Sequence, residues 1–167
     1  QGDITGFGEL CKTEKQFNKL RAKAGLLFQD PDDQLFCPTV LEDVMFGPLN
    51  LGFTKQQAIE KSLETLKTLG MQGFESRITH QLSGGEKRMI TLASVLVMEP
   101  EVLILDEPTN ALDEKAKMRL LNVLQTLPQA MIIISHDKLF SSQLATRQLT
   151  LSDGVLTEQP APDFAVA

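Results

Sequence analysis

Two adjacent carboxylates, Asp106 and Glu107, follow a short aliphatic run at residues 102–105. An aliphatic run bounded by charge is typical of a strand buried on both faces of a parallel sheet, which places the two acids at its carboxyl end. In nucleoside-triphosphate hydrolysis such a pair divides two tasks. Asp106 would hold magnesium, directly or through water, and Glu107 would polarise the attacking water. A strand simply capped by charge is the alternative interpretation of the pair alone.

A second candidate site is the segment Leu82, Ser83, Gly84, Gly85, Glu86. Ser83 and Glu86 have the spacing of a capping box, and helix capping alone would account for them. Capping does not require two consecutive glycines, each of which costs about 0.5–1 kcal/mol relative to Ala in a helix. Paired glycines instead let the first amides of the helix meet a phosphate, which the helix dipole also attracts. We therefore predict an anion site at this helix N-terminus.

Two more polar residues follow aliphatic runs. Gln29 ends the run at residues 24–28, and His136 follows the run at residues 131–134 and Ser135. Each alone would be an ordinary loop or strand-end residue. Because function gathers at the carboxyl ends of parallel strands, we expect both side chains near Asp106 and Glu107.

The elements that must position these residues alternate between buried strands and helices, which predicts an α/β fold with a parallel sheet. Helices are expected at residues 54–69, with a Thr54/Gln57 capping box and Gly70 as a stop, at residues 83–97, and at residues 113–127. Residues 1–10 predict a short strand and turn, and residues 147–157 a hairpin around Asp153 and Gly154. The tail at residues 159–167 is expected to be frayed.

The composition argues against several classes of protein. The formal net charge of -6 disfavours a nucleic-acid binder, because backbone affinity comes mainly from clustered Lys and Arg. No stretch approaches the about 20 apolar residues that cross a bilayer. Cys11 and Cys37 have no neighbour at metal-ligand spacing, so a reducing, cytoplasmic compartment is expected.

Taken together, the motifs resemble those of ATP-binding-cassette (ABC) ATPases. LSGGE at residues 82–86 is similar to the ABC signature, and LILDEPTNALD at residues 103–113 to the Walker B strand, catalytic Glu and D-loop. SHD at residues 135–137 resembles the switch-histidine loop, and FQD at residues 28–30 the Q-loop. Residues 28–52 and 82–88 further resemble the ATPase subunits of energy-coupling-factor importers, particularly the cobalt-type ones, which serve vitamins and transition-metal ions.

The resemblance implies a P-loop NTPase-like cassette over residues 1–158, with a helical signature region at about 38–98 inserted in the α/β core. Two such cassettes pair head to tail, with each ATP between one subunit's P-loop and the other's signature. The implied nucleotide-binding residues are Ser83, Gly84, Gly85, Glu86 and Asp113, the last joining the two sites across the interface. Within one subunit, Gln29 and Asp106 would serve magnesium, Glu107 would be the base, and His136 would hold the γ-phosphate.

The P-loop pattern G-x-x-x-x-G-K-[ST] does not occur in these 167 residues, because no Gly is followed by Lys. In the family that loop precedes the Q-loop. We therefore expect an amino-terminally truncated cassette that lacks its first strand, P-loop and helix and is inactive alone.

The implied partners are a second ABC ATPase subunit and the transmembrane subunit of an importer, which would hold the chain at the inner face of the cell membrane. The apolar residues at 40–53 are interrupted by Gly47, Pro48 and Gly52, which is too irregular for all of them to be core, and the exposed ones are expected to dock that subunit. The alternative is that most of them are simply buried. Two other classes stay open: a soluble ABC ATPase of DNA or ribosome handling, and a non-catalytic binding module. A P-loop encoded upstream of Gln1 in the gene would exclude the binding module. The sequence does not indicate which solute is transported.

Overall fold

A computed structural model describes residues 2–159 of the chain. Its central sheet has three parallel strands in the order β3, β4, β5, namely β3 (Ala24–Leu27), β4 (Val102–Asp106) and β5 (Ala130–Ile134). The predicted α/β fold with a parallel sheet is thereby confirmed. Of the tail predicted to be frayed, residues 160–167 lie outside the described residues.

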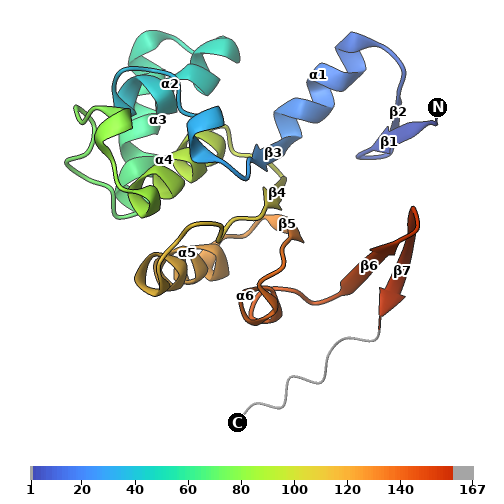
Figure 1. Cartoon of the computed structure of the whole chain (residues 1–167). Coiled ribbons are helices and arrows are strands. Elements are labelled where there is room, and N and C mark those ends of the chain that lie inside the picture. The colour runs from blue at the N-terminus through green and yellow to red at the C-terminus, as the bar shows by residue number, and fades with distance from the viewer. Residues whose placement is uncertain (1, 160–167) are drawn as a thin grey trace.

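The helices connect these strands (Figure 1). Between β3 and β4 run η1 (Pro31–Asp33), α2 (Val40–Asn50), α3 (Lys55–Thr68), η2 (Thr79–Gln81) and α4 (Gly84–Leu96). Helix α5 (Glu114–Thr126) joins β4 to β5, and α6 (Lys138–Ser142) follows β5. Helices α2, α3 and α4 pack on one another to one side of the sheet, and they fall within the region 38–98 that we interpret as an insertion.

The predicted helix starts are confirmed at their caps. The side chains of Thr54, Ser83 and Asp113 each accept a hydrogen bond from an amide in the first turn of α3, α4 and α5. Gly70 follows α3 with a φ of 66°, a left-handed conformation that suits a helix stop.

Helix α2 was not expected as a regular element, because Gly47 and Pro48 interrupt its sequence. A capping box between Thr39 and Glu42 starts the helix. Val40, Val44 and Pro48 then form a buried stripe at helical spacing, and this packing outweighs the weak propensity of the last turn. Helix α1 (Glu14–Lys23) was also not predicted, since none of its residues is buried and its only large apolar residues are Phe17 and Leu20.

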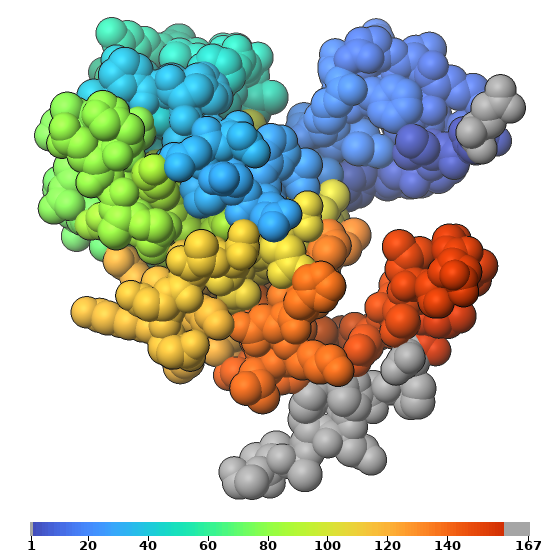
Figure 2. All heavy atoms as spheres, viewed as in Figure 1, coloured from blue at the N-terminus to red at the C-terminus, as the bar shows by residue number. Residues whose placement is uncertain are grey.

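The two ends of the described chain form antiparallel hairpins. Strands β1 (Ile4–Gly6) and β2 (Glu9–Cys11) pair near the start, and β6 (Gln148–Ser152) and β7 (Val155–Gln159) near the end. The predicted turn is present, with positive φ at both Asp153 and Gly154. Both hairpins stand away from the helical group (Figure 2).

One face of the sheet carries the core and the other is largely open. Leu27, Leu103 and Leu105 are fully buried beneath the helices, and a Cβ on Gly25 would meet Val95 of α4 at 2.3 Å. The opposite face presents a row in register, Leu26, Ile104 and Ile132, of which Leu26 is 42% and Ile132 54% exposed. The prediction of strands buried on both faces is therefore wrong for residues 2–159, because the described helices cover only one face.

Candidate functional site

A cleft of about 500 Å³ opens at the carboxyl ends of β3 and β4. It brings together Gln29 and Asp106, which the sequence placed at two separate strand ends. Asn110, which we did not predict, also lines it. Every ionisable side chain of the lining is a carboxylate: Asp30, Asp33 and Asp106.

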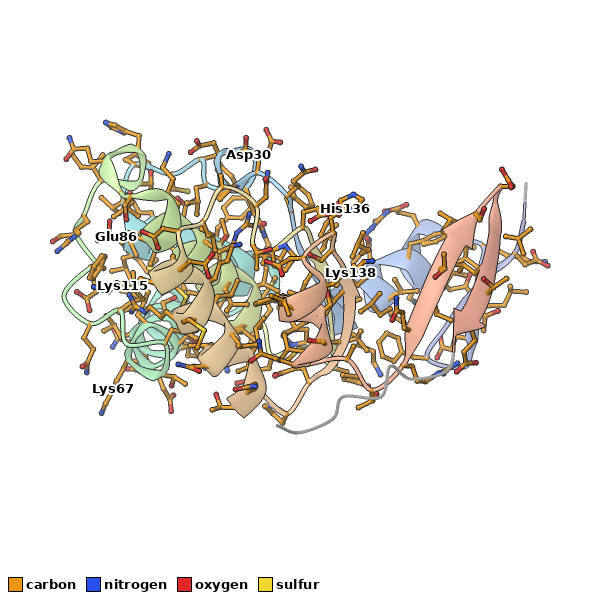
Figure 3. All side chains as sticks on the ribbon, turned by 60° about the horizontal axis from the view of Figure 1, so that its bottom comes forward. Asp30, Lys67, Glu86, Lys115, His136 and Lys138 are labelled. Atoms are coloured by element: carbon orange, nitrogen blue, oxygen red, sulfur yellow. The ribbon has the colours of Figure 1, made fainter. Side chains whose placement is uncertain are left out.

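Glu107 and His136 form a second contact beside this cleft. The amide of His136 donates to both carboxylate oxygens of Glu107, at 3.1 Å and 3.3 Å, and the hydroxyl of Ser135 donates to Oε2 at 3.4 Å. The imidazole Nε2 of His136 is 3.5 Å from Oε1 of Glu107, and the His136 side chain, labelled in Figure 3, is fully exposed to solvent. The expected pairing of strand ends is thus present, but Asp106 faces the cleft and Glu107 faces the loop after β5.

The backbone of the loop after β4 is strained at both ends. Glu107 has a φ of 42° and Ala111 a φ of 57°, which is left-handed for residues that carry a Cβ. Each such residue costs roughly 1–2 kcal/mol. The amide of Glu107 nevertheless donates to the carbonyl of Ile134 at 2.8 Å, which holds the residue to the end of β5.

The start of α4 forms a separate group of candidate residues. The carboxylate of Glu86 accepts from the amide and the hydroxyl of Ser83, both at 2.8 Å, and these bonds lower the pKa of Glu86. Arg77 adds an ion pair to Glu86 at 3.2 Å. The side chains of Ser83 and Arg77 are thus both bonded to Glu86. The donors left for an anion are the first amides of the helix, at Gly84 and Gly85.

Gly85 has a second role that the sequence did not indicate. A Cβ on Gly85 would meet the Cβ of Ala116 at 2.8 Å, whereas a Cβ on Gly84 would have nothing closer than 3.9 Å. Ala116 lies in the first turn of α5, and its amide donates to Asp113 at 2.7 Å. Close packing of two helix starts therefore explains Gly85, and access to an anion remains the explanation for Gly84 alone.

The different surroundings of Gly84 and Gly85 give a prediction about stability. Gly85→Ala is expected to destabilise the chain by about 1–3 kcal/mol, because the added methyl overlaps Ala116. Gly84→Ala serves as the matched control and is expected to leave the denaturation midpoint unchanged or raised. Ala116→Gly should restore the Gly85→Ala variant. Urea denaturation of the four chains measures this, and equal midpoints for the two alanine variants would contradict it.

Two buried charges were missed. Arg88 is 1% exposed and Asp43 is 4% exposed. Asp43 accepts from the amides of Phe36 and Cys37 at 3.1 Å and 3.0 Å, and burial raises its pKa. One sequence signal could have indicated the burial of Arg88, since it shares the apolar face of its helix with Leu92 and Val95 at i+4 and i+7.

The cleft suits magnesium better than it suits a phosphate. Asp106 and Gln29 supply oxygen donors, and Mg²⁺ in proteins is usually held by one or two carboxylates together with water and substrate phosphates. Among residues 2–159, no group of three or more His, Cys, Asp or Glu side chains forms a complete metal cage. Because no cationic side chain lines the cleft, its lining does not offset the negative charge of a triphosphate.

The family described as ABC transporter matches residues 1–110. The chain belongs to the ABC transporter family. A putative ABC transporter ATP-binding protein of Brucella suis is 56% identical over 155 residues, which cover 93% of this chain and 65% of that protein. The energy-coupling factor transporter ATP-binding protein EcfA of Methanothermobacter thermautotrophicus is 44% identical over 96% of this chain and 53% of its own length. The chain thus spans between half and two thirds of these relatives.

Solved structures agree with this membership in an ABC cassette fold. CbiO1 of Clostridium perfringens, part of the ABC transporter complex CbiONQ, superposes with a TM-score of 0.79 at 35% identity, covering 87% of this chain and 59% of CbiO1. A dimeric ATP-binding cassette bound to ADP and phosphate gives a TM-score of 0.82 at 24% identity over 98% of this chain and 75% of that one, a likeness of fold. No helix within residues 2–159 has the length and apolar character needed to cross a membrane.

Proposed function

We propose that this protein is the ATP-hydrolysing subunit of a cobalt-type importer for a metal ion or vitamin. The observation that carries the proposal is the arrangement of two half-sites. Gln29 and Asp106 line the cleft with Glu107 beside them, whereas the amides of Gly84 and Gly85 lie at the start of α4 and do not line it. Figure 3 shows Glu86 apart from His136. The two half-sites become one complete site when two subunits pair head to tail.

The residues at the strand ends divide the reaction among them. The Glu107 carboxylate takes the proton of the attacking water, and the amide of His136 and the hydroxyl of Ser135 hold that carboxylate in place. Asp106 and Gln29 would hold Mg²⁺, which would neutralise phosphate charge. The imidazole of His136, which is exposed to solvent beside Glu107, meets the γ-phosphate. The partner's copy of the α4 start supplies amides to the same phosphate, and Asp113 lies at the junction of the subunits.

The proposed docking surface for a transmembrane subunit is the outer side of α2 and its flanks. Three of the eight apolar residues at 40–53 are buried, namely Val40, Val44 and Met45, so the segment is only partly core. Its exposed residues, together with Phe36 just before the segment, form an apolar surface in which the ring centroids of Phe36 and Phe46 are 4.7 Å apart, edge to face. Its members are between 38% and 63% exposed: Phe36, Phe46, Leu49, Leu51 and Phe53. An amphipathic helix of the membrane subunit fits such a surface.

This surface gives the test of the proposed function. The product of the complete gene, co-expressed with the membrane subunit, is expected to copurify with it and to release phosphate from MgATP. Phe46→Glu should abolish copurification because it places a charge in the apolar surface, and it should leave phosphate release by the free subunit intact. Met118→Glu, at a 52% exposed apolar residue on α5, is the control. Copurification of the Phe46→Glu variant would contradict the proposed docking surface. Absence of phosphate release from the wild type would contradict the proposed ATPase activity.

A non-catalytic cassette is the second candidate. The observation that favours it is the cleft lining, in which all three ionisable groups are acidic. Such a chain would offer the start of α4 to an intact partner cassette and bind no nucleotide in its own cleft. A gene that encodes a P-loop upstream of Gln1 would rule out this candidate.

A further inference from the structure

Arg88 reaches from the signature helix to the loop that carries Gln29. It lies on α4, five residues after Ser83, and its side chain is fully buried. Its Nη1 donates to the carbonyl of Phe28 and its Nη2 to the carbonyl of Gln29, both at 2.6 Å. Its Nε has no hydrogen-bond partner among the described residues. One planar guanidinium thus holds two consecutive carbonyls of the chain.

This arrangement costs the folded state free energy. Burying a guanidinium against carbonyls leaves its charge without a directly bonded carboxylate, and an apolar side chain of similar volume often serves stability as well or better. Burial lowers the pKa of Arg88, and the charge of Asp30 only partly opposes that. A buried Arg at this position is therefore better explained by the geometry it imposes than by stability.

The geometry it imposes concerns the position of the loop relative to the helical region. Lys87, the preceding residue of α4, pairs with Asp32 at 2.6 Å. Farther along, Asp43 of α2 binds the amides of Phe36 and Cys37. The segment from residue 28 to residue 37 is thus held at its start, middle and end by charged side chains of the helical region.

We infer that Arg88 is a positioning residue for Gln29, which fixes the backbone from which the Gln29 side chain enters the cleft. This role rests on the proposed function of Gln29. Because Arg88 and the start of α4 belong to one helix, a displacement of Ser83 by a partner's nucleotide moves the anchor of Gln29 as well. Lys cannot replace Arg here, since a single ammonium lacks the planar fork that meets two carbonyls at once.

The first test uses the 167-residue chain and needs no ATPase activity. Arg88→Met is expected to speed amide hydrogen exchange at residues 32–35 by about tenfold or more, because the loop loses its anchor. Arg88→Lys should give a smaller increase, and it serves as the test if Arg88→Met does not fold. Lys61→Met, which removes the ion pair to Glu99 elsewhere in the helical region, is the control and should leave these amides unchanged. Unchanged exchange in the folded Arg88 variants overturns the inference.

The second test is a double-mutant cycle on ATP hydrolysis by the product of the complete gene. Arg88→Met is expected to lower kcat about tenfold with KM for ATP unchanged, and to cause no further loss when Gln29 is already Ala. A merely structural role would lower kcat equally in both backgrounds, which overturns the inference. If the wild type does not hydrolyse ATP, the proposed function fails, and the exchange experiment alone decides the role of Arg88.

Discussion

Glu107→Gln is expected to reduce ATP turnover by about 10²–10⁴-fold while MgATP binding is retained. The amide has the size of the carboxylate but cannot take a proton from water. It keeps an oxygen that accepts from the amide of His136, so the loop after β5 should stay in place. Steady-state phosphate release and calorimetric titration, both on the product of the complete gene, measure the two quantities.

Glu114→Gln is the matched control for this variant. Glu114 lies in the first turn of α5 with its side chain 90% exposed, so the same chemical change there should leave turnover unaltered. Turnover retained in Glu107→Gln would assign the base to another residue. Loss of turnover together with a lowered melting temperature would point to damage of the fold instead.

The 167-residue chain measured alone is expected to bind MgATP on the order of 10²-fold more weakly than a cassette that holds its own P-loop, or not at all in the micromolar range. The physical reason is the cleft itself, where Asp30, Asp33 and Asp106 repel a triphosphate and no cationic side chain lines the wall. The amides at the start of α4 do not help, because they lie outside the cleft.

Calorimetric titration of the chain with ATP and magnesium, beside the product of the complete gene, makes this measurement. A variant with Asp30→Asn and Asp33→Asn separates repulsion from the missing cradle. Removing two negative charges should weaken the repulsion without producing micromolar affinity, since amides do not replace a P-loop lysine. Micromolar binding by the unaltered chain would show that residues 1–167 carry a phosphate cradle of their own.

The sequence predicted the parts of the fold that depend on local signals. The aliphatic runs before Gln29, Asp106 and His136 became the three parallel strands, and capping residues such as Ser83 and Asp113 marked the helix starts. The signal is local in each case, because a strand end or a cap is set by residues within one turn or one run.

What the sequence did not predict depends on contacts between distant segments. Gly85 is needed because Ala116, 31 positions later by residue number, packs against it. Arg88 lies on the apolar face of its helix, but the reason for a buried charge there is not apparent until its two carbonyl partners, in the loop after β3, are known. The exposed face of the sheet was missed for the same reason, since an aliphatic strand has one sequence whether one face or both are covered.

The left-handed backbone at Glu107 bears on how this sequence can change over evolutionary time. Glycine or asparagine tolerates that conformation more readily, so either would relieve part of a strain of roughly 1–2 kcal/mol. Selection for hydrolysis and selection for a robust fold therefore act in opposite directions at this one codon.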